Sequence, residues 1–239
     1  MGEAAELSRF GRVVLSVASA VGAFANPARA DLIAALGETA PGTAAAVERL
    51  ARRMRQSDEG GTVLRERPRI KVHNTKHLAA LPENTFGRQY AEFMRRYGFR
   101  SDERAEVRFV DDDELAYVIQ RYRECHDLWH VLNNLPPTLL GEVTQKYFEA
   151  AHTGLPMAVL SAVVGPLRLR TADRNAFLLE WAPWAGRNAR RCADLMSVYY
   201  ERHWSDDLQQ LRRRLRITPA TMADDGSATG VSAGRAEAD

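Results

Sequence analysis

The sequence has only two cysteines, Cys125 and Cys192, in 239 residues. This number is too small for a disulfide-stabilised scaffold, and it suits a reducing compartment such as a cytosol or a mitochondrial matrix. The chain has little net charge, +2 at pH 7, so no nucleic-acid partner is expected. It also has no internal repeat and no obvious linker in its middle, which favours one sizeable domain.

Long hydrophobic runs are missing too. The apolar run at residues 157–169 is shorter than the roughly 20 residues that a transmembrane helix needs, and Pro166 interrupts it. The simpler interpretation of this run is a buried core helix. The other interpretation is that part of it lines a lipid tunnel or contacts a membrane surface.

The remaining pattern is mostly helical. Apolar residues recur at helical spacing, so the predicted fold class is all-α, with one multi-helix domain over residues 1–217. Glycines and prolines predict a loop-rich crossing at residues 57–82, and residues 107–110 are the one strand-like segment. Residues 218–239 have almost no large apolar side chain and are predicted to form a disordered C-terminal tail.

The segment at residues 7–30 allows two interpretations. Its arginines, together with its lack of acidic residues, are typical of a mitochondrial transit segment. Its valines also follow a helical pattern, and Glu3 and Glu6 precede it, which favours a helix that the mature protein retains.

A helix that carries two histidines is expected over residues 113–132. Acidic side chains at 111–114 favour a helix N-terminus, and two asparagines followed by two prolines favour its end. On this helix His126 and His130 lie one turn apart, on the same stripe as the apolar side chains. Both imidazoles should therefore face the protein interior.

These two histidines and two nearby carboxylates predict a metal site. His126 and His130 are close enough to bind one ion, and Asp127 lies on the flank of the same helix face. Glu142 follows a Pro-Pro break and Thr138, which can cap a new helix, so a short helix hairpin would bring it alongside. Two nitrogen and two oxygen ligands suit zinc, but also iron or manganese.

Each of these residues also has an ordinary structural explanation. Arg123 and Asp127, and likewise Glu142 and Lys146, have the spacing of ion pairs along a helix, and an inward histidine is usually hydrogen bonded in a core. Two histidines on one apolar stripe are costly to bury without partners, however, which favours the metal. Cys125 points about 100° away from the residue that follows it and is interpreted as structural.

The pattern His-Asp-x-x-His, followed after eleven residues by Glu, resembles the signature of the Coq-four family of ubiquinone (coenzyme Q) biosynthesis proteins. The framework around it is similar to that family in the same order. The matching segments are Pro27-Ala-Arg-Ala-Asp31-Leu, Pro68-Arg-Ile70, Thr85-Phe-Gly87 with Tyr90, Glu114-Leu-Ala-Tyr117 leading into Arg121-Tyr-Arg-Glu, Leu140-Gly-Glu-Val143 and Gly154-Leu-Pro-Met157. The likeness extends from about residue 7 to about residue 217.

The resemblance implies a mainly helical protein of the multi-protein assembly that makes coenzyme Q. It implies zinc bound by His126, Asp127, His130 and Glu142. It also implies metal-dependent, oxidative decarboxylation at ring C1 of a polyprenyl hydroxybenzoate precursor. The location implied is peripheral, on the matrix side of the mitochondrial inner membrane, with a bacterial cytoplasm or inner membrane face as the alternative. Whether the chain forms a homo-oligomer stays open.

Arg121 and Arg123 stand just before the two histidines and are candidate substrate-binding residues. A guanidinium can hold the carboxylate of a substrate through two parallel hydrogen bonds. The simpler role for both residues is surface ion pairing.

Three other functions are open to the same residues. One is a non-catalytic scaffold or lipid-binding organiser of the assembly, whose structural metal has all four positions filled by protein. Another is a di-iron carboxylate oxidase, indicated by a second carboxylate–histidine spacing from Glu149 to His152. A metal-dependent hydrolase is disfavoured, because Asp127 stands where zinc proteases have a glutamate after the first histidine.

Overall fold

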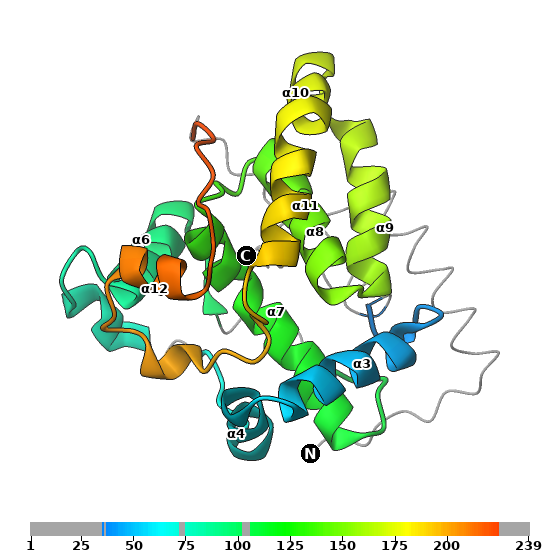
Figure 1. Ribbon diagram of the computed structural model, residues 1–239, viewed down its shortest axis with the longest axis vertical. Coiled ribbons are helices and arrows are strands. Elements are labelled where there is room, and N and C mark those ends of the chain that lie inside the picture. Colours follow the sequence, from blue (N-terminus) through cyan, green and yellow to red (C-terminus); the bar gives the residue numbers. More distant parts are fainter. Residues whose placement is uncertain (1–34, 36, 72–74, 102–105, 225–239) are drawn as a thin grey trace, which may run out of the picture.

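The computed structural model of the chain describes residues 35, 37–71, 75–101 and 106–224, and this part is helical (Figure 1). Its α-helices are α3 (Thr43–Arg55), α4 (Asp58–Glu66), α6 (Phe86–Tyr97), α7 (Asp113–Asn133), α8 (Leu139–Thr153), α9 (Pro156–Val164), α10 (Thr171–Ala176), α11 (Ala182–Arg191) and α12 (Leu208–Arg214). The shorter segments are the 3-10 turns η1 (Lys76–Ala80), η3 (Gly165–Arg168) and η5 (Tyr200–Arg202) and the π-helical turn η4 (Phe177–Trp181). The all-α prediction is confirmed.

Within the described ranges no strand forms, and the β-type pairing there is limited to one isolated bridge. The prediction of a strand at residues 107–110 was wrong. The backbone N–H groups of Arg108 and Phe109 donate to the carboxylate of Glu38, at 2.7 and 2.6 Å. A buried side chain therefore satisfies the backbone groups that a neighbouring strand would otherwise bind.

Helix α7 is the central element, and α3, α4 and α6 pack on it (Figure 1). It ends one residue beyond the predicted helix. The Asp112 carboxylate accepts hydrogen bonds from two backbone N–H groups of the first turn, and Asn134 ends the helix with a φ of 55°. From Tyr117 to the end of the helix, every side chain except that of Arg123 is buried. The polar side chains buried on this part of α7 must therefore find their partners inside the protein.

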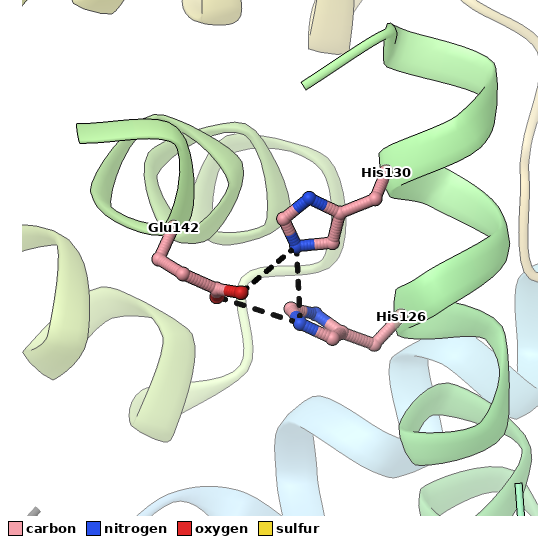
Figure 2. Close-up of side chains that lie close together, drawn as sticks. All are labelled: His126, His130 and Glu142. Atoms are coloured by element: carbon pink, nitrogen blue, oxygen red, sulfur yellow. Dashed lines mark hydrogen bonds and ion pairs between the residues drawn. The ribbon is translucent and has the colours of Figure 1, made fainter. Parts of the chain in front are cut away.

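A tight turn joins α7 to α8. The chain breaks at Pro136 and Pro137, and the hydroxyl of Thr138 caps α8 by accepting a hydrogen bond from the N–H of Gly141 at 3.2 Å. Gly141 lies so close to the turn that an added Cβ would stand 1.9 Å from the carbonyl oxygen of Pro136. The predicted hairpin is confirmed, and it places Glu142 in the first turn of α8, facing α7 (Figure 2).

The predicted loop-rich crossing at residues 57–82 was wrong in its first part, where α4 forms. Ser57 caps this helix by accepting a hydrogen bond from the N–H of Gly60 at 3.0 Å, and two acidic residues in the first turn complement the helix dipole. An added Cβ at position 60 would lie 2.5 Å from the carbonyl oxygen of Met54. This glycine therefore serves close packing and does not mark a loop.

The main core lies between α7 and its neighbours. Trp129 is fully buried in it, and its ring meets that of Phe148 edge-on, with 6.4 Å between centroids. Its indole Nε1 donates to the hydroxyl of Tyr200 at 2.9 Å. Because Phe148 belongs to α8, this packing fixes α7 and α8 relative to each other, and with them the polar side chains between the two helices.

The apolar run at residues 157–169 forms α9 and η3, and its interpretation as a buried core helix holds for one face only. Ala158 and Ala162 are buried, whereas Val163 and Leu167 are 67% and 70% exposed. The large apolar side chains that the described part of the chain leaves exposed are Val159, Leu160, Val163, Leu167, Leu178 and Leu179, here called the exposed apolar set. Among the helices described, none has the length and apolar character that crossing a bilayer requires.

Residues 218–224 contradict the first part of the predicted tail. The N–H of Thr218 donates to the side-chain oxygen of Asn188 at 3.0 Å, and the N–H of Ala220 donates to the carbonyl oxygen of Asn133 at 2.7 Å. A helix leaves its last carbonyl groups without internal partners. This segment supplies a partner at the end of α7, so it stays on the domain although it has few large apolar side chains.

Two predicted segments lie outside the described residues. They are the N-terminal helix or transit segment at residues 7–30 and the last part of the predicted tail, 225–239.

Candidate metal centre

Three of the four predicted ligands meet between α7 and α8 (Figure 2). Nε2 of His130 lies 3.2 Å from Nε2 of His126. The Glu142 carboxylate lies 3.3 Å from Nε2 of His130 and 3.5 Å from Nε2 of His126. One ligand atom from each residue lies within 4.8 Å of the other two, and no other such group occurs among the residues that the structure describes. We call these three residues the histidine–glutamate cluster.

The other ring nitrogen of each histidine is already engaged. Nδ1 of His130 lies 3.0 Å from the carbonyl oxygen of Leu135, and Nδ1 of His126 lies 2.6 Å from the carboxylate of Glu149. The carbonyl oxygen of Leu135 and the carboxylate of Glu149 are acceptors, so a proton on each Nδ1 satisfies them and leaves each Nε2 with a lone pair. Nζ of Lys146 also lies 3.2 Å from Nδ1 of His126, and it donates to Glu149 at 2.8 Å. Two lone pairs facing each other at 3.2 Å repel unless a proton or a metal ion lies between them.

Glu149 is held in place by its own donors. It is fully buried and accepts hydrogen bonds from the hydroxyl of Tyr122, from Nζ of Lys146 at 2.8 Å and from the amide of Gln145 at 3.2 Å. A carboxylate that fixes the tautomer and orientation of an imidazole is the usual support of a metal-bound histidine.

The electrostatics of the cluster favour a positive charge. Burial and Lys146 act to lower the pKa of His126, but the carboxylates of Glu149 and Glu142 outweigh them and raise it. Burial acts to raise the pKa of Glu142, but His130 and His126 hold it well below its ordinary value. Glu142 is therefore ionised at neutral pH, as a metal ligand must be.

Asp127, the fourth predicted ligand, is buried on α7, but it does not belong to the group of atoms within 4.8 Å of one another. Its role as a ligand stays a prediction. Cys125 is buried as well, and burial raises the pKa of its thiol to about 12. A neutral thiol is a poor metal ligand, in keeping with a structural role for Cys125.

Arg121 and Arg123 are occupied by carboxylates of the chain itself. Arg121 is fully buried, donates to both carboxylate oxygens of Glu201 and reaches the carbonyl oxygen of Val198 at 3.2 Å. Arg123 pairs with Glu38 at 2.7 Å. Through these contacts both arginines connect segments that are distant in the sequence, which is a structural role. Their role in holding a substrate stays a prediction, and these contacts add no support to it.

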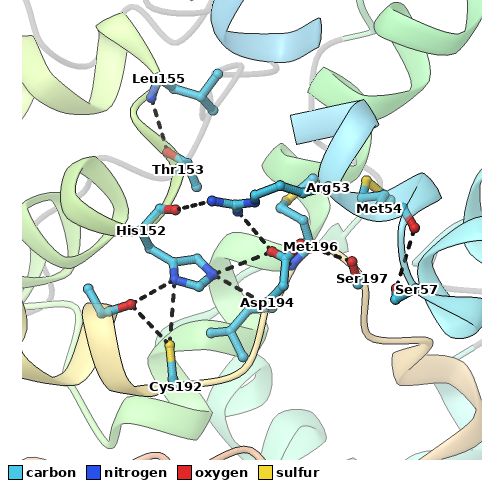
Figure 3. Close-up of polar contacts among 12 residues, drawn as sticks. Arg53, Met54, Ser57, His152, Thr153, Leu155, Cys192, Asp194, Met196 and Ser197 are labelled. Atoms are coloured by element: carbon cyan, nitrogen blue, oxygen red, sulfur yellow. Dashed lines mark hydrogen bonds and ion pairs between the residues drawn. The ribbon is translucent and has the colours of Figure 1, made fainter. Parts of the chain in front are cut away.

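The second carboxylate–histidine spacing does not bring His152 to the cluster. Nδ1 of His152 lies 3.1 Å from the carbonyl oxygen of Ala189, and its Nε2 accepts a hydrogen bond from the N–H of Leu195 at 3.1 Å (Figure 3). Both ring nitrogens are thus satisfied by backbone groups, as in an ordinary core histidine. The di-iron alternative, which needs a second histidine ligand, therefore gains no support from His152.

A pocket of about 500 Å³ adjoins the cluster at His130. Phe93 of α6 stacks on the imidazole of His130, with 5.7 Å between ring centroids, and Tyr97 lines the pocket as a second aromatic residue. Arg212 of α12 and Met222 of the C-terminal segment also line it. The volume suits a small organic molecule.

Sequence reasoning missed two residues of this region, Glu149 as the partner of His126 and Arg212 as a pocket residue. A signal for Glu149 existed, because it lies seven residues after Glu142 and therefore on the same face of α8. No signal marked Arg212. It is one of three consecutive arginines, and only the fold buries it while the other two stay exposed.

The fold and the cluster together define an all-α protein with a buried site of two histidines and one glutamate, a donor set that fits zinc, iron or manganese. Residues 2–221 match the family described as coenzyme Q (ubiquinone) biosynthesis protein Coq4. The chain belongs to this Coq4 family.

Curated relatives agree with this assignment. The chain is 45% identical over 214 residues to the mitochondrial ubiquinone biosynthesis protein COQ4 homolog of Aedes aegypti. The aligned residues cover 89% of this chain and 77% of that protein. It is 47% identical over 208 residues to the Danio rerio homolog, and this alignment covers 86% of this chain and 76% of that protein. It is 44% identical over 217 residues to the Homo sapiens homolog, and this alignment covers 90% of this chain and 81% of that protein.

A solved structure shares the fold. The crystal structure of a protein from Nostoc punctiforme, provisionally described as a ubiquinone biosynthesis protein, superposes with a TM-score of 0.68 over 88% of this chain and 98% of that chain. At 20% sequence identity the similarity concerns the fold alone.

Proposed function

We propose that this chain catalyses a metal-dependent decarboxylation at ring C1 of a polyprenyl hydroxybenzoate, within the assembly that makes coenzyme Q. The family supports the pathway. The histidine–glutamate cluster supports a divalent metal, and the pocket at His130 supports a bound ring with the start of an apolar tail.

The proposed reaction breaks the bond between ring C1 and the carboxylate carbon. In the simple form, carbon dioxide leaves, the electron pair of that bond stays on the ring, and a proton is added at C1. In the oxidative form, one dioxygen and one hydroxybenzoate give the corresponding quinone, carbon dioxide and water. The substrate then supplies all the electrons, so the protein needs no other reductant.

The residues of the chain would hold and orient the reacting groups. A divalent cation, when bound, stabilises negative charge on a carboxylate or phenolate oxygen. His126, His130 and Glu142 would bind it, and the family resemblance adds Asp127. Glu149 keeps Nδ1 of His126 protonated through their 2.6 Å contact, so Nε2 stays available to the metal.

One observation carries the proposal: the two Nε2 atoms face each other at 3.2 Å with the ionised Glu142 beside them. A non-catalytic scaffold with a structural metal is the second candidate. His130 is the cluster residue that lines the pocket. A pocket beside the cluster supports catalysis over a scaffold, because a substrate needs access to a catalytic metal and not to a structural one.

The test measures metal and turnover on the same protein samples. Metal content of freshly purified wild type, His130→Ala and Asp127→Asn is determined by mass spectrometry, with His77→Ala as the matched control, since His77 is exposed on η1. Carbon dioxide release from a prenylated hydroxybenzoate is followed with and without oxygen. We expect one metal per chain in wild type and His77→Ala, and loss of both metal and carbon dioxide release in His130→Ala.

Other results would revise the proposal in defined ways. Metal retained in His130→Ala would remove the cluster as the metal site. Metal lost in that variant without carbon dioxide release by the wild type would favour the scaffold. Loss of metal in Asp127→Asn to the same extent as in His130→Ala would make Asp127 the fourth ligand.

A peripheral membrane contact is proposed through the exposed apolar set. Leu178 and Leu179 are 56% and 82% exposed. Arg174 of α10 connects that helix to η3 by donating hydrogen bonds to the carbonyl oxygens of Pro166 and Leu167. Apolar side chains on a firmly held surface can enter the interface of a bilayer, and the exposed Arg168 and Arg170 nearby suit anionic lipid. Curated relatives are named mitochondrial, and the proposed location is the matrix side of the inner membrane.

Vesicle sedimentation tests this contact. Wild type should bind vesicles of phosphatidylcholine with anionic cardiolipin, and Leu178→Ser/Leu179→Ser should bind them several-fold less. Binding that is equal in the two proteins would contradict the proposed surface.

A further inference from the structure

We propose that Arg212 binds the anionic group of an aromatic substrate in the pocket at His130. This inference rests on the proposed function and deepens it, because it names the chemistry by which the site recognises its ligand: a ring carboxylate against a buried guanidinium.

Arg212 is set apart from its neighbours by burial. It is 6% exposed, whereas Arg213 and Arg214 on the same helix are exposed. Its Nε donates to the carbonyl oxygen of Leu132 at 2.9 Å, and its Nη2 donates to that of Val131 at 2.7 Å. Both carbonyls belong to the last turn of α7, immediately after His130. The guanidinium is therefore fixed to the same helix end that carries a residue of the cluster.

Arg212 has no carboxylate partner among the residues that the structure describes, and its Nη1 makes no hydrogen bond to them. Burial lowers the pKa of its guanidinium to about 10, so it still carries a full charge at neutral pH. Arg121, which is also buried, is paired with Glu201. A buried cation without a counter-ion is costly, and a bound anion in the pocket would offset that cost.

The acidic residues of the pocket wall are Glu83, Glu92, Asp207 and Asp224. Asp224 pairs with Arg96 at 2.6 Å, and Glu92 pairs with a neighbouring arginine of α6. Asp207 caps α12 by accepting a hydrogen bond from the N–H of Gln210, and Glu83 is exposed to solvent. Three of these four carboxylates are thus engaged by partners other than Arg212.

The rest of the pocket suits an aromatic ring with an apolar substituent. Phe93 and Tyr97 offer aromatic faces, and Val131, Leu135 and Met222 add apolar surface. Rings pack well on aromatic side chains, and a guanidinium binds a carboxylate through two parallel hydrogen bonds or through one free N–H. The combination fits an aromatic carboxylate better than a neutral ring.

The contribution of Arg212 should appear in affinity more than in rate. The carboxylate is bound before the reaction and is lost during it, so an interaction with Arg212 is made in the ground state and does not grow in the transition state. Removal of such an interaction raises KM and leaves kcat little changed. Removal of a residue that only stabilises the fold would not raise KM while leaving kcat little changed.

Calorimetric titration of the full chain with 4-hydroxybenzoate and with its methyl ester provides the test. The wild type should bind the acid more tightly than the ester. Arg212→Gln should lose roughly 10–100-fold in affinity for the acid, the loss expected for a hydrogen bond to a charged group, and keep its affinity for the ester. Arg212→Lys should keep part of the preference for the acid, and Arg213→Gln, the matched control, should behave as the wild type.

Retained ester binding also shows that Arg212→Gln still has a folded pocket, since Arg212 supports the end of α7. Equal binding of acid and ester by the wild type would overturn the proposal. So would unchanged acid binding in Arg212→Gln, or an equal loss of acid and ester binding in both Arg212 variants, which would make the residue structural.

The titration needs no turnover, so it separates this inference from the proposed function. Acid binding that depends on Arg212, without carbon dioxide release by the wild type, would leave the anion site standing and refute the decarboxylase. Carbon dioxide release with the same KM in wild type and Arg212→Gln would refute the anion site and leave the decarboxylase standing.

Discussion

The carboxylate of Glu149 on α8 lies 2.6 Å from Nδ1 of His126 on α7. Glu149 is fully buried, and Tyr122, Lys146 and Gln145 all donate hydrogen bonds to it. The orientation of one predicted metal ligand is thus fixed by a residue outside the ligand motif, and this dependence can be measured.

Glu149→Gln should lower metal affinity by roughly 10–100-fold, because a neutral amide holds the imidazole less firmly and no longer raises its basicity. Competition with a chromogenic chelator measures the affinity. Glu180→Gln is the matched control, since Glu180 is exposed. Equal metal affinity in the two variants would show that Glu149 does not support the site.

Gly141→Ala should both destabilise the protein and weaken metal binding. An added Cβ would lie 1.9 Å from the carbonyl oxygen of Pro136, so the start of α8 must move, and with it the adjacent Glu142. Overpacking of this kind costs about 1–3 kcal/mol. Urea unfolding and metal analysis measure the two effects.

Gly61→Ala is the control for Gly141→Ala, because an added Cβ at position 61 meets nothing within 4 Å. It lies inside α4, where alanine should stabilise the helix by about 0.5–1 kcal/mol. Full metal binding and unchanged stability in Gly141→Ala would contradict the role given to the tight turn.

Arg121→Met should destabilise the protein by about 3–5 kcal/mol, because it leaves the Glu201 carboxylate without the partner that the fold provides. A double variant with Glu201→Leu should recover much of this loss. Urea unfolding of the wild type, both single variants and the double variant gives the coupling energy. A loss of substrate affinity in Arg121→Met at unchanged stability would instead support the predicted substrate role.

Both thiols should react slowly in the folded protein. Burial raises the pKa of Cys125 and of Cys192 to about 12, against an ordinary value of about 8.5. The thiolate is the reactive form, so at pH 8 the reactive fraction falls by about three orders of magnitude. Ellman's reagent should label neither thiol quickly in buffer, and both should react promptly in urea.

The same shift has a consequence for stability. The folded pKa lies above the unfolded one, so the stabilising contribution is complete below about pH 8.5 and is lost as pH rises toward 12. Unfolding free energy should therefore decrease above about pH 8.5, and less so in a Cys125→Ser/Cys192→Ser variant. Fast labelling of either thiol at pH 8 in the folded state would show that it is accessible.

Local sequence rules were sufficient where partners are close along the chain. The capping residues of α7 and α8, the stripe that holds His126 and His130, and the break at Pro136 all depend on neighbours within a few residues. The same rules failed at α4, because Gly60 is used for close packing against Met54, and a sequence shows the glycine without its neighbour in space.

The sequence by itself determined that the chain is helical and that two histidines and Glu142 come together on a hairpin, since helical periodicity and turn chemistry are local. Only the tertiary structure decided which groups complete the site. It brought Glu149 to His126, left Asp127 outside the cluster, and buried Arg212 beside the end of α7 while Arg213 stayed exposed. These outcomes depend on how helices distant in sequence pack together, and a residue's type does not reveal which neighbours packing will give it.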